Sequence, residues 1–186
     1  TRKESSAASD VYKRQGYARE NAEGIDLHSP QRNYKDPNPK PELIAALTQF
    51  RAMAGFRPAE QLTALFQAFS SPELDRYATL LPASDGAGDM RVLFTTLVSL
   101  PRQALTDLLA AVEASARGLA GSDGQPAWVS EAAEVYLELS ERYPGDAGAL
   151  AALLLNIVTL EPGEGAFLGA GQLHAYLSGF GVEVMA

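Results

Sequence analysis

The side chains best suited to metal or proton chemistry lie in two short segments that are far apart in the chain. Lys40 and Glu42 end a proline-rich stretch, and His174 follows a glycine-rich turn. The chain has no cysteine, so a zinc site must use nitrogen and oxygen ligands. Taken alone, such a histidine is more often packed or at the surface, and a lone glutamate is usually solvated. Residue types and spacing alone therefore leave the metal site open.

Both segments resemble type I mannose-6-phosphate isomerases. Residues 34–42 read Tyr-Lys-Asp-Pro-Asn-Pro-Lys-Pro-Glu and are similar to the family signature Y-K-D-x-N-H-K-P-E. Residues 153–186 resemble the family's run L-L-L-N-x-V-x-L-x-P-G-E, which leads to H-A-Y-L-x-G and E-x-M-A. Residues 50–56 resemble the strand that follows the first signature. The resemblance extends nearly throughout residues 16–186.

The resemblance implies a partial cupin-type β-barrel or sandwich with an inserted helical domain. It also implies one Zn²⁺ per complete enzyme, held by Gln, His, Glu and His. On matching positions, Glu42 is the carboxylate ligand and His174 the last histidine ligand. Lys40 and Tyr176 line the substrate pocket, and Glu183 points into the same barrel. The implied reaction interconverts mannose 6-phosphate and fructose 6-phosphate, so the expected partner is a small sugar phosphate.

The chemistry of this isomerisation suits the candidate residues. Moving a proton between C2 and C1 of the sugar passes through an enediol-like state with negative charge on oxygen, which zinc can stabilise as a Lewis acid. Glu183 or Lys40 is the expected catalytic group that shuttles the proton. Lys40 could instead pair with the substrate or with the carboxylate of Glu183. A purely structural salt bridge of Glu183 also stays open.

The chain departs from the family pattern in ways that predict a fragment lacking both ends. The family's Gln-x-His pair lies upstream of Gly16, where residues 1–15 are unmatched and are interpreted as a tag or gene-model artefact. Pro39 stands where the family usually has histidine, and His28 is a loop histidine. We expect weak zinc binding and no turnover by this polypeptide. The alternative is a degenerate cupin-fold module that binds sugar phosphates or proteins without catalysis.

Composition narrows the classes of binding partner that remain. The formal net charge of −8 argues against nonspecific nucleic-acid binding, which needs a basic surface. The longest apolar stretch, around residues 151–155, is too short for a membrane helix, and no signal peptide is visible. We therefore predict a cytoplasmic protein without a membrane or nucleic-acid partner, and a monomer when complete.

Periodicity predicts an α+β fold in which residues 16–57 and 147–186 form a β domain and residues 58–146 an all-helical insertion. A short helix is expected over residues 16–22, and a proline-rich loop over residues 30–41. Runs of β-branched and aromatic residues predict the strands: residues 42–48, 51–56, 153–160, 166–168, 173–177 and 182–185.

The expected helices follow an apolar repeat of three and four residues. Leu62, Leu65, Phe66 and Phe69 form the first such stripe, and the stripes around residues 105–112 and 132–139 repeat its spacing. Ser70 and Glu73 have the spacing of a capping box. These stripes are interpreted as core, and an exposed apolar stripe would instead indicate a protein-interaction module.

Overall fold

The computed structural model describes residues 6–81 and 87–185, with side chains from residue 12 and, after the gap, from residue 90. The chain divides into two compact units. The first, here called the β unit, comprises Thr1–Gly55 and Val158–Ala186, and the second, the helical unit, comprises Phe56–Ile157. Each is described by itself. Among the helices that the model describes, none combines the length and apolarity needed to cross a bilayer.

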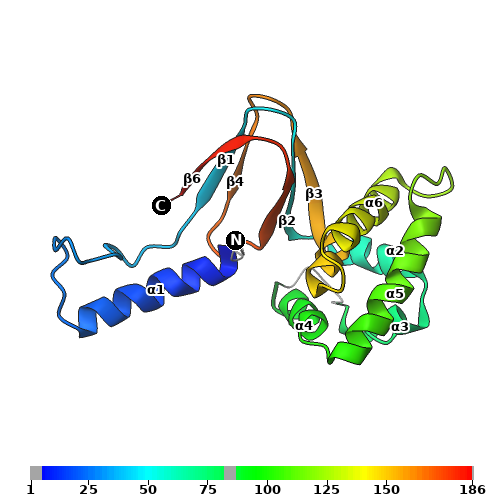
Figure 1. Ribbon diagram of the computed structural model, residues 1–186, viewed down its shortest axis with the longest axis horizontal. Helices are drawn as coiled ribbons and strands as arrows, with labels where there is room; N and C mark the ends of the chain where they lie inside the picture. Colours follow the sequence, from blue (N-terminus) through cyan, green and yellow to red (C-terminus); the bar gives the residue numbers. More distant parts are fainter. Residues whose placement is uncertain (1–5, 82–86, 186) are drawn as a thin grey trace. The chain divides into compact units, whose positions relative to one another are not determined.

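The β unit begins with a helix longer than the sequence predicted. Helix α1 spans Ser6–Ala22 and thus includes most of the segment interpreted as a tag or gene-model artefact (Figure 1). This segment has no apolar stripe, so periodicity did not predict a helix there. Its alanine, lysine, arginine and glutamate residues favour helix through their backbone propensity alone. Residues 1–5 of the predicted leader lie outside the described part of the chain.

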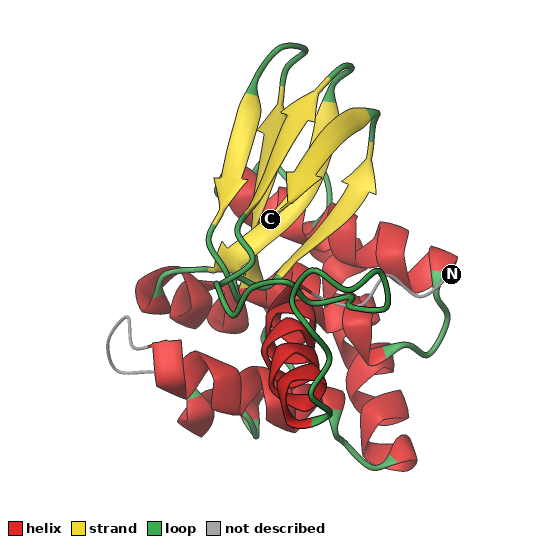
Figure 2. Cartoon of the chain, turned by 90° about the vertical axis from the view of Figure 1, so that its left-hand side faces the viewer, coloured by secondary structure: helices red, strands yellow, loops and turns green. Residues whose placement is uncertain are grey.

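Two three-stranded sheets follow, with strand orders β4-β1-β6 and β3-β2-β5 (Figure 2). The mixed α+β class predicted from the sequence is confirmed, and each predicted strand is present with ends that differ by one or two residues. Strand β1 pairs antiparallel with β4 and β6, and β2 pairs antiparallel with β5. The strand bounds are β1 Glu42–Ala46, β2 Phe50–Phe56, β3 Leu155–Leu160, β4 Gly165–Leu168, β5 His174–Ser178 and β6 Gly181–Met185.

The two sheets share an apolar core. Ile44 and Ala46 of β1 pack with Phe50 and Ala52 of β2 and with Leu160 of β3. The hairpin between β5 and β6 closes over this core at Gly179, which has φ of 111°. A Cβ at this position would lie 2.5 Å from the carbonyl oxygen of Gln49, so the turn requires glycine. The core therefore fixes β1, which carries Glu42, and packs against Tyr176 of β5.

The register puts the candidate residues of β1 and β6 on one face. Glu183 lies opposite Ile44, so its side chain shares the inner face with Glu42 and Ile44. A register shift between Arg51 and Ala52 interrupts the pairing of β2 with β5. Such bulges twist the strand locally and re-aim the neighbouring side chains.

The helical unit is built around α5, which contacts α2, α3 and α6. Its helices bury their apolar stripes, with Leu62, Leu65, Leu93 and Leu108 among the fully buried side chains. Helices α2, α5 and α6 all begin directly after a proline. The bounds are α2 Ala59–Phe69, α3 Pro72–Asp75, η1 Ala78–Leu80, α4 Ala87–Val98, α5 Arg102–Leu119, α6 Ala127–Arg142, η2 Ala147–Leu150 and α7 Ala151–Leu154.

Two local predictions in this unit were wrong. The cap of α3 is Ser71, whose hydroxyl accepts the amide hydrogen of Leu74, while Ser70 adopts a left-handed conformation that ends α2. The proline at position 72 selects Ser71 because proline favours the first helical position directly after the cap. The apolar run predicted as one strand from residue 153 begins as helix α7 and becomes β3 only at Leu155.

Candidate metal centre

The side chains of Glu42, His174 and Glu183 meet on the inner side of the β unit. Glu42 begins β1, His174 begins β5 and Glu183 lies within β6. One ligand atom from each lies within 4.8 Å of the other two. Glu42 is 5% exposed, so its carboxylate is withdrawn from bulk water. Two carboxylates and an imidazole at this spacing form a donor set of the kind that binds divalent zinc.

The hydrogen bonds of His174 define the state of its ring. Nδ1 lies 3.0 Å from the main-chain carbonyl oxygen of Gln172. A carbonyl can only accept, so this contact is a hydrogen bond when Nδ1 carries the hydrogen. Nε2 then faces Oε2 of Glu42 at 3.2 Å. In the neutral ring these two atoms are both acceptors, and a proton or a metal ion between them is needed to make their approach favourable.

The spacing of these two atoms fits a tetrahedral zinc site. Zinc–ligand bonds of about 2.05 Å place neighbouring ligand atoms of a tetrahedron about 3.3 Å apart. The observed 3.2 Å between Nε2 of His174 and Oε2 of Glu42 agrees with that value. The hydrogen bond from Nδ1 to a carbonyl is also the usual outer contact of a metal-binding histidine. The residues present therefore fit the metal that the sequence predicted.

Tyr176 connects Glu183 to the aromatic part of the core. Its hydroxyl donates a short hydrogen bond to Oε1 of Glu183. Its ring lies edge-on to Phe50, with centroids 5.2 Å apart, and 5.4 Å from the ring of His174. Burial, followed by the hydrogen bond to the Glu183 carboxylate, raises the pKa of Tyr176 well above its ordinary value. The phenol is therefore a neutral hydrogen-bond donor at neutral pH.

Lys40 completes the polar group. Its ammonium nitrogen lies 3.7 Å from Oε1 of Glu42, and its side chain is 21% exposed. Lys40 thus joins the inner carboxylate to the more open side of the cluster. All five residues singled out in the sequence are brought together here, with Lys40 beside Glu42. His28 lies apart, in an exposed turn where its main-chain amide donates to Oδ1 of Asp26.

The β unit also contains a second buried cluster of charged residues, which was not predicted from the sequence. Glu20 of α1 is 2% exposed and accepts hydrogen bonds from the amides of Tyr34 and Asn33 at 2.9 and 3.2 Å. Arg32, also buried, lies 3.6 Å from Glu20. The amide of Tyr34 is the main cause that lowers the pKa of Glu20. Charged residues on a polar helix are normally solvated, so no pattern in the sequence singled them out.

The guanidinium of Arg32 has several further contacts. Its three nitrogens donate to Tyr34, Ile25 and Asn21 at 2.8, 2.5 and 2.6 Å, and it lies over the ring of Tyr17. Glu20 and Arg32 thus both have hydrogen-bond partners in addition to each other. This cluster fastens the loop that leads to Lys40 onto α1.

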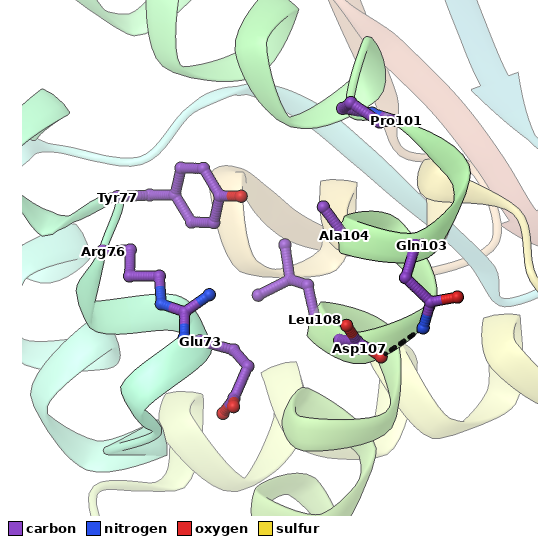
Figure 3. A pocket seen from close by; sticks show the side chains of 8 residues that line it. All are labelled: Glu73, Arg76, Tyr77, Pro101, Gln103, Ala104, Asp107 and Leu108. Atoms are coloured by element: carbon purple, nitrogen blue, oxygen red, sulfur yellow. Dashed lines mark hydrogen bonds between the residues drawn. The ribbon is translucent and has the colours of Figure 1, made fainter.

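The helical unit offers a different kind of hollow. A shallow pocket of about 340 Å³ lies between the segment around α3 and the start of α5 (Figure 3). The ring of Tyr77 and the side chain of Arg76 face Ala104 and Leu108 across it. Its lining contains no histidine, and the carboxylate of Asp107 accepts from Gln103. The pocket lacks the donor set of the β unit.

The helices also give little support to an interaction surface. Among the side chains described in the helical unit, the large apolar ones that are exposed are Val92, Val98 and Tyr143. Val92 and Val98 lie on α4, whereas Tyr143 directly follows α6, so these described residues do not form a continuous stripe. Scattered exposed apolar residues are ordinary on soluble domains.

Comparison with known proteins finds relatives that match most of this chain. The family model "Phosphomannose isomerase type I, catalytic domain" matches residues 14–59. Mannose-6-phosphate isomerase of Salmonella typhimurium is 40% identical over 171 residues, which cover 92% of this chain and 41% of the relative. The human mannose-6-phosphate isomerase is 34% identical over 179 residues. Over most of its length the chain is thus similar to mannose-6-phosphate isomerases, and residues 14–59 match the type I catalytic domain.

Solved structures of phosphomannose isomerases have the same fold over the matched part. A zinc-bound mannose 6-phosphate isomerase superimposes with a TM-score of 0.69 at 36% identity, covering 95% of this chain and 42% of that one. A Salmonella typhimurium structure bound to fructose 6-phosphate and zinc gives a TM-score of 0.70 at the same identity. The chain thus spans about two fifths of the length of these relatives.

Proposed function

We propose that the chain carries the metal and proton-transfer centre of an isomerase that interconverts mannose 6-phosphate and fructose 6-phosphate. The observation that carries the proposal is the buried approach of Nε2 of His174 to Oε2 of Glu42 at 3.2 Å, which favours a bound cation. The zinc and fructose 6-phosphate of the solved relatives support the choice of metal and substrate. We also infer that the two packed sheets are part of a cupin-type barrel.

Glu42 and His174 would hold the metal, with Glu183 at the edge of the same group. When bound, Zn²⁺ supplies a Lewis acid that stabilises negative charge on the sugar oxygens. The ion pair of Glu42 with Lys40 keeps the carboxylate oriented toward His174. Burial strengthens each of these electrostatic interactions because the local dielectric is low.

Glu183 is the group that we assign to proton transfer between C1 and C2 of the sugar. The hydroxyl of Tyr176 donates to Oε1 of Glu183, which leaves Oε2 to accept a proton from the substrate. Tyr176 thereby orients the base. Lys40, on the more open side, is suited to bind a substrate oxygen or to share in the proton transfer.

Two further expectations accompany this proposal. A small phosphorylated sugar is a diffusible ligand, which agrees with a cytoplasmic monomer in the complete enzyme. A binding module without catalysis is the competing outcome, because the same cluster could hold a metal and a sugar without moving a proton.

The test combines zinc titration with a sugar-phosphate assay on the chain. We expect one equivalent of zinc to bind, and fructose 6-phosphate to bind only when zinc is present. Incorporation of solvent deuterium into the sugar at C1 or C2, followed by NMR, reports proton transfer. We expect it in a version extended to the length of the relatives, with the Gln-x-His pair, and it should disappear there in Glu183→Gln. Zinc-independent sugar binding without exchange would favour the binding module. A chain that binds neither zinc nor sugar contradicts the proposal.

A further inference from the structure

The turn that precedes His174 is closed by both the side chain and the main chain of Gln172. The amide of Gly169 donates to Oε1 of Gln172 at 3.1 Å, and the amide of Gln172 donates back to the carbonyl of Gly169 at 3.0 Å. Gly171 lies between them with φ of 73°, in the left-handed region. A turn with two glycines has large conformational freedom, so this reciprocal pair of hydrogen bonds is what restricts it.

The same residue also fixes the histidine. The carbonyl of Gln172 accepts the hydrogen of Nδ1 of His174 at 3.0 Å. Gln172 therefore has its side chain bonded to one end of the turn and its carbonyl bonded to the imidazole. Any rotation of the turn would carry that carbonyl away from Nδ1 and release the ring.

We propose that Gln172 is a positioning residue of the metal centre. Its side-chain amide holds the turn closed, so that its carbonyl keeps the hydrogen on Nδ1 of His174 and leaves Nε2 directed at the metal. The inference rests on the proposed metal-binding function and extends it to a residue outside the ligand set. Outer groups that fix the ring of a ligating histidine contribute to metal affinity by preorganising it.

Zinc affinity of matched variants tests the proposal, measured by competition with a chromophoric chelator. Gln172→Ala removes the acceptor for Gly169 and should weaken zinc binding on the order of tenfold. Gln172→Glu keeps a side-chain oxygen that can accept from the Gly169 amide and should restore the affinity. Gln49→Ala is the control, because Gln49 also makes a side-chain hydrogen bond in the β unit, to Glu161, away from the cluster. Its zinc affinity should equal that of the unsubstituted chain.

Nitrogen NMR of the histidine rings gives a readout that loss of stability would not imitate. The chain has only two histidines, so His28→Gln leaves the signals of His174 alone. In the zinc-loaded chain we expect the metal on Nε2 and the hydrogen on Nδ1. In the metal-free neutral ring the hydrogen should also reside on Nδ1, the opposite of the usual preference of free histidine. Gln172→Ala should show both ring forms.

The outcomes separate the two proposals. If the unsubstituted chain does not bind zinc, the proposed function fails, while the metal-free ring spectrum still tests the role of Gln172. If all variants bind zinc equally, the inference about Gln172 fails and the metal centre stands. A hydrogen on Nε2 in the unsubstituted metal-free chain overturns the inference even if Gln172→Ala does not fold.

Discussion

Two buried carboxylates of the β unit, Glu20 and Glu42, have opposite surroundings. Glu20 accepts main-chain amide hydrogens from Asn33 and Tyr34 and lies beside Arg32. Glu42 instead faces an imidazole nitrogen and, at longer range, the ammonium group of Lys40. A carboxylate bonded to fixed amides has its charge compensated by the fold itself. The contacts of Glu42 leave room for a cation, and this difference distinguishes a structural cluster from a functional one.

The largest expected effect is on metal affinity. Glu42→Gln removes a charged ligand and should weaken zinc binding on the order of 100-fold or more, beyond the usual cost of losing an outer contact. Glu20→Gln should leave zinc affinity within about threefold, because Glu20 contacts the loop and not the ligands. Chelator competition on both variants checks the contrast. Equal losses in the two variants would mean that the clusters act as one.

The second-largest effect is on stability, which should depend more on Glu20 than on Glu42. In Glu20→Gln the buried guanidinium of Arg32 keeps its charge but loses its carboxylate, which is the costly way to break a buried pair. Exchange of the Asn33 and Tyr34 amide hydrogens should become roughly tenfold faster. Glu23→Gln is the control directly after the same helix, since the Glu23 side chain forms an exposed pair with Arg19. Unchanged protection in Glu20→Gln would contradict the structural role.

A smaller effect is expected in acid. The amide of Tyr34 is the leading cause that lowers the pKa of Glu20 below its ordinary 4.5. The stabilisation by Glu20 is therefore complete above about pH 4.5 and is lost as the pH falls through the lower, folded-state pKa. Glu20→Gln should flatten this acid dependence of the β unit, followed through the amide signals of β1. An acid limb that is identical in the variant would assign the loss to other carboxylates.

The smallest effect concerns the phenol beside the metal cluster. Burial and the Glu183 carboxylate both raise the pKa of Tyr176. Folding therefore favours the neutral phenol, and this contribution is present below the unfolded pKa near 10 and lost at higher pH. Glu183→Gln should lower the pKa of Tyr176 only part of the way, because burial is the larger cause. Phenolate absorbance reports the shift, and Glu161→Gln, an exposed site, is the control.

The two clusters also differ in how far the sequence predicted them. Lys40, Glu42, His174, Tyr176 and Glu183 were chosen because they lie in long motifs that resemble a known family, and the structure places them together. Glu20 and Arg32 were not chosen, since α1 carries no apolar stripe and its polar residues gave no indication of burial. Long-range burial of charge depends on where a loop returns to its helix, which local patterns do not encode.

The sequence by itself determined the α+β class, the positions of the strands within one or two residues, the apolar helix stripes and the exclusion of thiolate ligands. These follow from residue type and from the periods of helix and strand, which are local properties. Only the tertiary structure decided the contact of Nδ1 of His174 with the Gln172 carbonyl and the 3.2 Å approach of that ring to Glu42. Each of these depends on contacts between residues distant in the chain or on the closure of a flexible turn, and neither is fixed until the strands have packed.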